Sequence, residues 1–179
     1  MSAPQSCDGA AVDRDFDHFV ASASPGLLRA AYLLTGDTCE AEDLLQGALL
    51  RVFRRWGAIS ESPTSYAFTV LMNLSRDRRR WLHRQRTTLA GESRDGPATV
   101  DPVARLLDRS EIAQAARRLP RAQQAVIACR YLLDLSVTET ALALDLPEGT
   151  VKSYTARALA KMRELLTTRS QQPMEVETC

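Results

Sequence analysis

Apolar residues recur at intervals of three and four along most of this chain, which is the period of an amphipathic helix. The pattern predicts helices over residues 14–34, 39–56, 62–89, 102–117, 120–132, 136–145 and 148–166. No segment alternates apolar and polar residues in the way that a half-buried strand does. We therefore expect an all-α fold.

Turn and capping residues refine the ends of these helices. We expect Ser24–Pro25 to be the cap and first residue of the second half of the first helix, and Thr38 to cap the next helix. Gly36 and Gly57 are predicted to end the first and second helices.

The residues between 91 and 102 divide the chain. Their sequence, GESRDGPATVDP, has no apolar period and is rich in Gly, Pro, Ser and Asp, as flexible linkers are. The sequence therefore predicts two small helical domains, at 13–90 and 103–168, joined by a flexible linker. A disordered N-terminus at 1–12 and a mobile tail at 169–179 are expected to flank them.

The segment from Ser136 to Ser153 predicts a helix, a tight turn and a second helix. Ser136 and Glu139 form a capping box, and Pro147–Gly149 ends the first helix. In the second helix the outward stripe contains Lys152, Ser153, Ala156 and Arg157, opposite an apolar stripe of Val151, Thr155, Ala158, Met162 and Leu165. A helix-turn-helix places its second helix in the DNA major groove, and cations beside small residues suit that partner. An ordinary helical hairpin with a solvated basic face is the alternative.

Charge is distributed unevenly, although the 179 residues sum to only +1 at pH 7. Residues 1–45 carry a net charge of −6 and residues 46–90 carry +7. An acidic block beside a basic block favours two kinds of partner, one of them nucleic acid. The four cysteines are scattered and the two histidines lie far from any cysteine pair, so we expect reduced thiols, no metal and no cofactor. No apolar run is long enough to cross a membrane, and we expect a cytoplasmic protein.

The helix predicted over 39–56 carries an apolar residue on its polar face. That face holds Asp43, Gln46, Gly47, Leu50 and Arg54. Gly47 costs the helix roughly 1 kcal/mol relative to alanine, which close approach of a partner would explain. We predict a protein-docking face here, with a solvated face bearing one stray leucine as the alternative.

The helix predicted over 62–89 is rich in arginine: six lie between Arg76 and Arg86, opposed by Asp77 alone. A helical projection turns Val70, Leu74, Trp81 and Leu82 inward and Arg76, Arg79, Arg80 and His83 outward, with Met72 and Asn73 at the edge of the outward cluster. Tyr66 and Phe68 are expected to bring rings to the same surface. Cations neutralise phosphates, rings stack on unpaired bases and an amide reads a base edge, so we predict a single-stranded nucleic-acid site. Core aromatics beside a solvated basic face are the alternative.

Three segments together resemble the extracytoplasmic-function (ECF) group of bacterial RNA polymerase sigma factors, and within it an actinobacterial lineage. They are Leu33–Gln46, Tyr66–Arg80, and the segment from Leu119 through Arg130 to Ser153. The resemblance covers residues 15–168. It implies that the domain at 13–90 is sigma region 2 and that the domain at 103–168 is sigma region 4.

The resemblance also implies partners and roles. It implies an alternative sigma factor without catalytic activity, which binds core RNA polymerase through the clamp helices of the largest subunit and the flap, and promoter DNA in duplex and melted form. It assigns polymerase binding to Asp43, Gln46, Leu50 and Arg54, the −10 element and its melting to Tyr66, Asn73, Arg76, Arg79 and Arg80, and the −35 element to Arg130, Lys152, Ser153, Ala156 and Arg157. Many relatives are held inactive by an anti-sigma factor, which makes such a factor a possible further partner.

Two other classes of function compete with a sigma factor. A stand-alone helix-turn-helix regulator is the main alternative, and the docking helix and the arginine–aromatic segment argue against it. An enzyme is disfavoured, because no nucleophile–histidine pair, metal cluster or Gly-rich phosphate loop can be assembled from the two histidines and the scattered cysteines.

Overall fold

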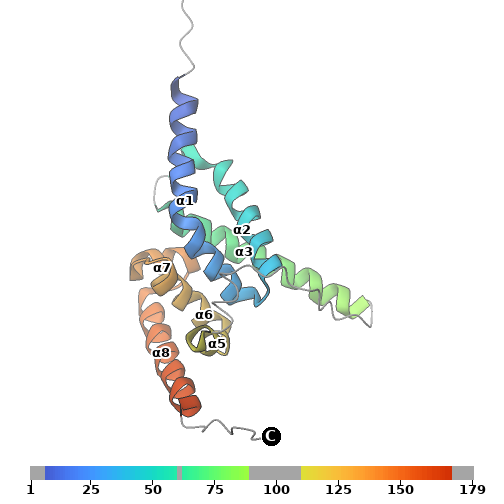
Figure 1. Cartoon of the computed structure of the whole chain (residues 1–179), viewed down its shortest axis with the longest axis vertical. Coiled ribbons are helices and arrows are strands. Elements are labelled where there is room, and N and C mark those ends of the chain that lie inside the picture. The colour runs from blue at the N-terminus through green and yellow to red at the C-terminus, as the bar shows by residue number, and fades with distance from the viewer. Residues whose placement is uncertain (1–6, 60–61, 89–109, 171–179) are drawn as a thin grey trace, which may run out of the picture.

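The computed structural model describes residues 7–59, 62–88 and 110–170, and within these ranges it is helical with no strand. The elements are α1 (Cys7–Thr35), α2 (Thr38–Phe53), a 3₁₀ turn η1 (Trp56–Ala58), α3 (Pro63–Thr88), α5 (Glu111–Arg117), α6 (Arg121–Ile127), a π turn η2 (Ala128–Leu132), α7 (Val137–Leu144) and α8 (Glu148–Ser170) (Figure 1). The expected all-α fold is confirmed. The linker predicted at 91–102 and the tail beyond Ser170 lie outside the described residues. None of the described helices is long and apolar enough to span a lipid bilayer.

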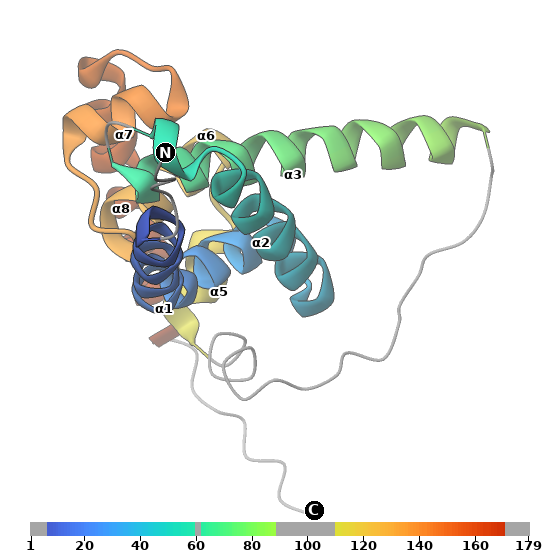
Figure 2. The ribbon, with the colours of Figure 1, turned by 90° about the horizontal axis from the view of Figure 1, so that it is seen from above.

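Helices α1, α2 and α3 form the first bundle. Its centre is built from fully buried apolar side chains, among them Leu27, Val52, Phe68 and Leu71. One end is closed by an aromatic cluster of Phe16, Phe19, Phe53 and Trp56, whose neighbouring ring centroids lie 4.9 to 6.1 Å apart. Rings at these separations in tilted or edge-on geometry stabilise a core beyond the area that they bury. The first half of α3 belongs to this bundle, whereas its C-terminal half projects away from it as a lone helix (Figure 2).

Helices α5 to α8 form the second bundle, which contains the predicted helix-turn-helix. Ser136 Oγ accepts the backbone N–H of Glu139 at 3.1 Å, and a carboxylate oxygen of Glu139 accepts the backbone N–H of Ser136 at 2.8 Å, so the capping box is confirmed. Asp145 ends α7 in the left-handed conformation at φ 53°. Val151 and Ala158, on the inward side of α8, are fully buried.

Contrary to the picture of two modules held only by a tether, the bundles pack directly against each other. Helix α1 contacts α5, α6 and η2, and α3 contacts α7. A single cluster of buried apolar residues runs through both bundles. Periodicity within one helix does not report such long-range packing, and the sequence did not predict it.

Several predicted boundaries were wrong. Residues 7–12 belong to α1, which also continues through Pro25, and Ser24 Oγ is buried without a hydrogen-bond partner among the described residues instead of capping a helix. The packing of both halves of α1 stabilises the helix by more than the missing backbone N–H of Pro25 destabilises it. Asp37, rather than Thr38, caps α2 by accepting the backbone N–H of Glu40 at 2.7 Å.

Other boundaries shifted by smaller amounts. Helix α2 ends at Phe53, so Gly57 lies in η1 instead of ending the helix. Gly36 does follow the end of α1, at φ +79°, and Ser62–Pro63 does begin α3. In the segment 102–117 the described helix covers Glu111–Arg117, and α8 continues past 166 to Ser170.

Replacing the cap residue Ser136 should weaken the helix-turn-helix. We expect Ser136→Ala to lower the free energy of unfolding by about 1 kcal/mol, because the N–H of Glu139 loses its acceptor. Urea denaturation followed by circular dichroism measures this. The control is Ser22→Ala, an exposed serine inside α1 that caps nothing; an equal loss in both variants would contradict the role of the cap.

Candidate nucleic-acid interface

Three of the four residues predicted on the outward face of α8 are exposed. Lys152, Ala156 and Arg157 are exposed, and Ser153 is half-buried with its hydroxyl donating to the carbonyl of Thr150 at 3.0 Å. The hydroxyl of Thr138 in α7 donates to the Glu148 carboxylate at 2.7 Å, which ties the start of α7 to the start of α8. Two cations around a residue with a one-carbon side chain leave room for a nucleic-acid backbone to approach the helix.

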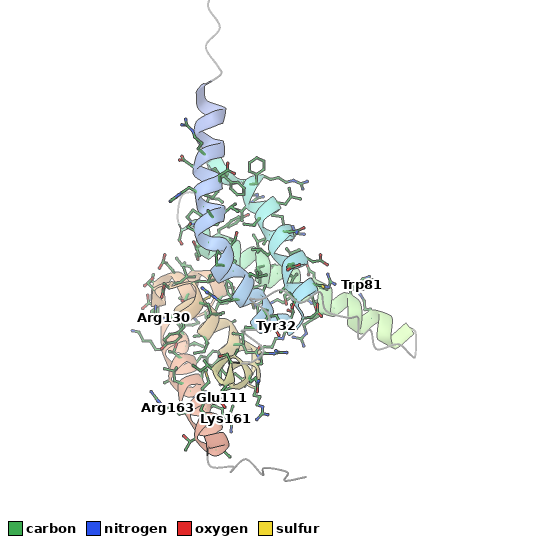
Figure 3. The ribbon with its side chains drawn as sticks, in the orientation of Figure 1. Tyr32, Trp81, Glu111, Arg130, Lys161 and Arg163 are labelled. Atoms are coloured by element: carbon green, nitrogen blue, oxygen red, sulfur yellow. The ribbon has the colours of Figure 1, made fainter. Side chains whose placement is uncertain are left out.

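Arg130 lies before the helix-turn-helix, on η2 (Figure 3). It is half-buried, and its guanidinium donates to the carbonyl of Leu135 in the loop that leads into α7. Its first role in this structure is therefore to hold that loop. A guanidinium has five N–H donors, so others remain for a second partner.

The structure brings Tyr66 and Asn73, which are seven residues apart, into one small cleft. The cleft has a volume of about 330 Å³ and is lined by Arg51, Arg54, Arg55, Tyr66, Val70 and Asn73. Three cations, one ring and one amide thus line this cleft, which is large enough to admit a nucleobase. Arg54, which the sequence grouped with the docking face of α2, lines this cleft together with Tyr66. Arg51 and Arg55 were not singled out from the sequence; the available signal was their i, i+4 spacing, with Arg51 in the last turn of α2 and Arg55 just before η1.

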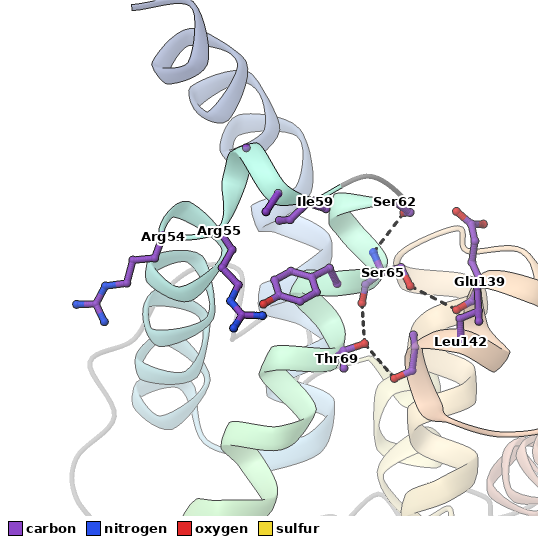
Figure 4. Close-up of a pocket in the computed structure, with 12 residues that line it drawn as sticks. Arg54, Arg55, Ile59, Ser62, Ser65, Thr69, Glu139 and Leu142 are labelled. Carbon is purple, nitrogen blue, oxygen red and sulfur yellow. Dashed lines mark hydrogen bonds between the residues drawn. The ribbon is translucent and has the colours of Figure 1, made fainter. Parts of the chain in front are cut away.

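A larger cleft of about 880 Å³ adjoins the first and shares Arg54, Arg55 and Tyr66 with it (Figure 4). One wall comes from the first bundle and the opposite wall from α7. The hydroxyl of Thr69 donates to the carbonyl of Ala143 at 3.0 Å, and the hydroxyl of Ser65 to the carbonyl of Glu139 at 3.4 Å. The α7 helix is therefore hydrogen-bonded to the same helix that presents Tyr66 and Asn73.

The carboxylate of Glu139 sets the charge of the α7 wall. Its pKa is lowered, first by the backbone N–H of Ser136 and then by the hydroxyls of Ser136 and Ser62. Glu139 is thus negatively charged at neutral pH and lines the cleft that Arg54 and Arg55 line from the other bundle.

The arginine-rich part of α3 agrees only in part with the helical projection. Arg76, Arg79, Arg80 and Asn73 are exposed, as predicted. Phe68 is fully buried and Met72 is buried, so neither reaches the basic surface. Trp81 is 50% exposed instead of inward, because the end of α3 projects beyond the helices that could cover it (Figures 2 and 3). The side chains of Leu82 and His83 lie outside the described residues.

Arg78 connects the basic helix to the acidic one. Its guanidinium lies 3.4 Å from carboxylate oxygens of both Glu40 and Asp43 on α2. Asp43 remains largely exposed, so water screens this pair and the pair contributes little to stability. The contact leaves the Asp43 carboxylate accessible to a partner.

The polar face of α2 holds a larger apolar patch than the sequence indicated. Asp43 and Gln46 are exposed, Leu50 is 52% exposed, and Phe53, one turn further on, is 47% exposed. Gly47 does not belong to this face, because a Cβ there would lie 3.3 Å from a methyl group of Leu74 on α3. The glycine therefore allows α2 and α3 to pack closely, which corrects the expectation that it admits a partner.

The described residues offer no site for a metal: no group of three or more His, Cys, Asp or Glu side chains converges there. Cys129 is buried, and its burial raises the pKa of the thiol to about 12. It is therefore a neutral thiol at physiological pH, which makes it a poor nucleophile. Cys39, at the start of α2, is exposed and free.

Comparison with protein families gives the class of protein. The model of "Sigma-70 region 2" matches residues 19–85, and that of "Sigma-70, region 4" matches residues 109–162. The RNA polymerase sigma-E factor of Streptomyces avermitilis is 32% identical over 155 residues, covering 87% of each chain. The ECF RNA polymerase sigma factor SigL of Mycobacterium tuberculosis is 37% identical over 153 residues, covering 80% of this chain and 86% of that one.

Two solved structures share the fold of this chain. The sigma factor RpoE of Bartonella quintana, in complex with the anti-sigma factor NepR, superimposes with a TM-score of 0.69 at 25% identity, covering 86% of this chain and 98% of that one. CnrH in complex with the cytosolic domain of CnrY shares the fold, with a TM-score of 0.64 at 21% identity over 89% of this chain and 94% of that one. The two domains define a bacterial sigma factor. The chain belongs to the ECF group of RNA polymerase sigma factors.

The cleft around Tyr66 gives a prediction for opened DNA. We expect Tyr66→Ala to lower the affinity of the polymerase complex for a fork-shaped promoter fragment by about 1–3 kcal/mol, or roughly 5- to 150-fold, through loss of stacking on an unpaired base. Fluorescence anisotropy with a labelled non-template strand measures it. Tyr66→Phe should retain most of the affinity, and Tyr131→Ala, at an exposed tyrosine on η2, should retain all of it. Equal affinities for the two alanine variants would contradict the assignment.

Proposed function

We propose that this chain acts as an alternative sigma factor: it binds core RNA polymerase, recognises the −35 and −10 promoter elements, and helps to melt the DNA so that transcription starts. The observation that carries the proposal is the placement of three different surfaces on one chain. They are the basic face of α8, the arginine–tyrosine–asparagine cleft of the first bundle, and the acidic and apolar face of α2. The chain is proposed to act in the cytoplasm and to contribute no catalytic group of its own.

At the −35 element, α8 is proposed to enter the major groove. Lys152 and Arg157 supply cations for phosphates and base edges, and Ala156 allows the groove floor to come close. Ser153 stands beside them, and Arg130 supports the loop before α7. The buried Val151 and Ala158 fix the helix on its other side, so the reading face is presented without rearrangement.

At the −10 element, the cleft of the first bundle is proposed to receive an unpaired base. Extruding a base from the stack costs a few kcal/mol, which must be offset by new contacts. Tyr66 offers a ring for stacking and Asn73 an amide for the base edge. Arg51, Arg54 and Arg55 at the cleft, with Arg76, Arg79 and Arg80 along α3, offer cations for the phosphates of the same strand.

The exposed face of α2 is proposed to dock on the clamp helices of the largest polymerase subunit. Leu50 and Phe53 would lose water on contact, and polar contacts of Asp43 and Gln46 would fix the position of α2 along the clamp helices. The second bundle is proposed to reach the flap. An anti-sigma factor is a further proposed partner, since the similar RpoE of Bartonella quintana was solved with one.

Transcription in vitro with purified core polymerase tests the proposal. We expect the chain to make core enzyme start RNA synthesis at defined sites in a library of genomic fragments, whereas core enzyme alone does not. Binding of duplex DNA without any stimulation of core enzyme would instead support a stand-alone helix-turn-helix regulator.

Removing a positive charge from α8 should weaken binding to the −35 element and leave the polymerase contact unchanged. We expect Lys152→Ala or Arg157→Ala to weaken binding of a −35 duplex by about 1–3 kcal/mol, roughly 5- to 150-fold, if each reads a base. Association with core polymerase should not change. Electrophoretic mobility shift and polymerase pull-down measure the two effects, and Arg14→Ala, at an exposed arginine of α1, is the control. Loss of polymerase association would overturn the assignment of this face.

A charge placed in the apolar patch of α2 should affect the polymerase contact. We expect Leu50→Glu to reduce the affinity for core polymerase by at least 10-fold, because a carboxylate would lose water at the centre of the interface (about 1.4 kcal/mol per 10-fold). Binding to the isolated −35 duplex should stay unchanged. Biolayer interferometry with immobilised core enzyme measures this; an unchanged affinity would show that the patch is ordinary wet surface.

A further inference from the structure

A third cavity lies apart from the surfaces proposed to bind DNA and polymerase. It has a volume of about 350 Å³ and is lined by residues of α1, α5, α6, η2 and α8. The buried side chains of Leu33, Ala116, Ile127 and Met162 belong to its wall. Tyr32, which also lines it, lies near the end of α1 (Figure 3). Sites for small molecules are mostly apolar spaces of roughly 300–1,000 Å³ with a few polar groups, so this cavity has the size and the wall of such a site.

The cavity reaches the surface beside two exposed apolar side chains. Ile112 of α5 is 62% exposed and Tyr131 of η2 is 53% exposed, and both line the cavity. Large apolar side chains at the edge of an apolar space stay in contact with water until a partner covers them. A ligand can enter here, and its apolar part would remove water from both side chains.

Among the described residues, the cation of Arg29 has no partner. Arg29 of α1 is half-buried and lines the cavity, and its Nε is buried without a hydrogen-bond partner among these residues. No described Asp or Glu lines the cavity; Glu111, which stands between two lining residues, is exposed and lies outside the lining. A charge that loses water is normally paired, because its desolvation is costly. The unpaired Arg29 therefore favours an anion in this cavity.

The other arginine of the wall, Arg117, is held by the protein itself. It lies 5.1 Å from the ring centroid of Tyr32 and donates to the Tyr32 hydroxyl at 3.1 Å and to the carbonyl of Gly36 at 3.2 Å. These contacts fix one side of the cavity. The donor for a ligand is therefore Arg29 and not Arg117.

We propose that this cavity binds an organic carboxylate whose apolar body fills the space between α1, α5 and α8. The carboxylate accepts hydrogen bonds from the guanidinium of Arg29, whose two Nη atoms carry four donors besides Nε. Hydrogen bonds between a guanidinium and a carboxylate are strong because both groups are charged. An inorganic anion has no apolar part with which to replace water against Leu33 and Met162.

The volume of the cavity sets the size of the ligand. At about 30 Å³ for each non-hydrogen atom, which is the volume of one water molecule in the liquid, the cavity of about 350 Å³ holds about twelve atoms. Decanoate, with about that number of atoms, is a suitable probe. Decanol has nearly the same apolar body and no charge, so the pair separates the contribution of the cation from that of the apolar wall.

Calorimetric titration of the full chain with sodium decanoate, below the concentration at which it forms micelles, tests the proposal. We expect saturable binding at one site. Decanol should bind about 10-fold more weakly or worse, because it lacks the charge that strengthens the bonds to Arg29.

Two variants test the two parts of the site. Arg29→Gln should lower the affinity for decanoate by about 10-fold or more and leave the affinity for decanol unchanged. Its control is Arg118→Gln, at an exposed arginine outside the lining. Ala113→Phe places a ring in the cavity and should weaken both ligands, whereas Ala21→Phe, at an exposed position of α1, should weaken neither. Circular dichroism shows whether each variant keeps its helices.

Methionine methyl groups report where the ligand binds. Met162 lines the cavity, whereas Met72 is buried in the first bundle and does not line it. In nuclear magnetic resonance spectra of the methyl-labelled chain, decanoate should shift the signal of Met162 with the dissociation constant found by calorimetry. The signal of Met72 should not move.

Four results would overturn the proposal. Decanoate could fail to bind saturably, decanol could bind as tightly, Arg29→Gln could retain the full affinity for decanoate, or the Met162 signal could stay in place. Binding that appears only after Leu106 and Leu107 are changed to Ser would show that the chain's own residues before Ser110 fill the cavity, which also overturns it. None of these measurements involves DNA or polymerase, so their failure leaves the proposed function untouched.

Discussion

Apolar packing between helices that are distant in sequence positions each surface that we propose to bind DNA or polymerase. One continuous cluster of buried residues extends from Phe19 in α1 to Met162 in α8, and the exposed faces of α2, α3 and α8 are the outer sides of helices that contribute to it. Buried apolar side chains, in addition to polar contacts, support both the cleft that Tyr66 lines and the exposed face of α8 that carries Arg157. Because the same core also joins the two bundles, the surfaces proposed to bind DNA are held relative to each other in this structure.

This shared core determines how the two bundles are joined. An interface made only of ion pairs would open readily, since exposed pairs contribute about 0–1 kcal/mol each. Here buried alanines and leucines of α1 meet α5 and η2, and Arg117 adds a contact that is both a hydrogen bond and a cation–ring contact. The joint between the bundles therefore consists of packed apolar side chains as well as polar contacts.

The sequence predicted those features that one helix determines by itself. The outward stripe of α8 and the capping box of Ser136 follow from spacing alone, and both have the expected exposure or hydrogen bonds. Features that depend on a neighbour were missed. Phe68 faces the core because the first half of α3 packs in the bundle, and Trp81 faces water because the second half leaves it; the periodicity of α3 does not report this difference. Gly47 and Gly26 both mark close contacts with helices distant in the chain.

The most direct test of the account is photo-crosslinking from both bundles to a single promoter. A benzophenone amino acid replaces Tyr66 in one sample and Lys152 in another, each assembled with core polymerase on the same labelled DNA. The account predicts a crosslink from position 66 to the opened strand of the −10 element and one from position 152 to duplex about 25 base pairs, or about 85 Å, upstream. Crosslinks from both positions to neighbouring nucleotides, or from position 66 to duplex alone, would contradict it.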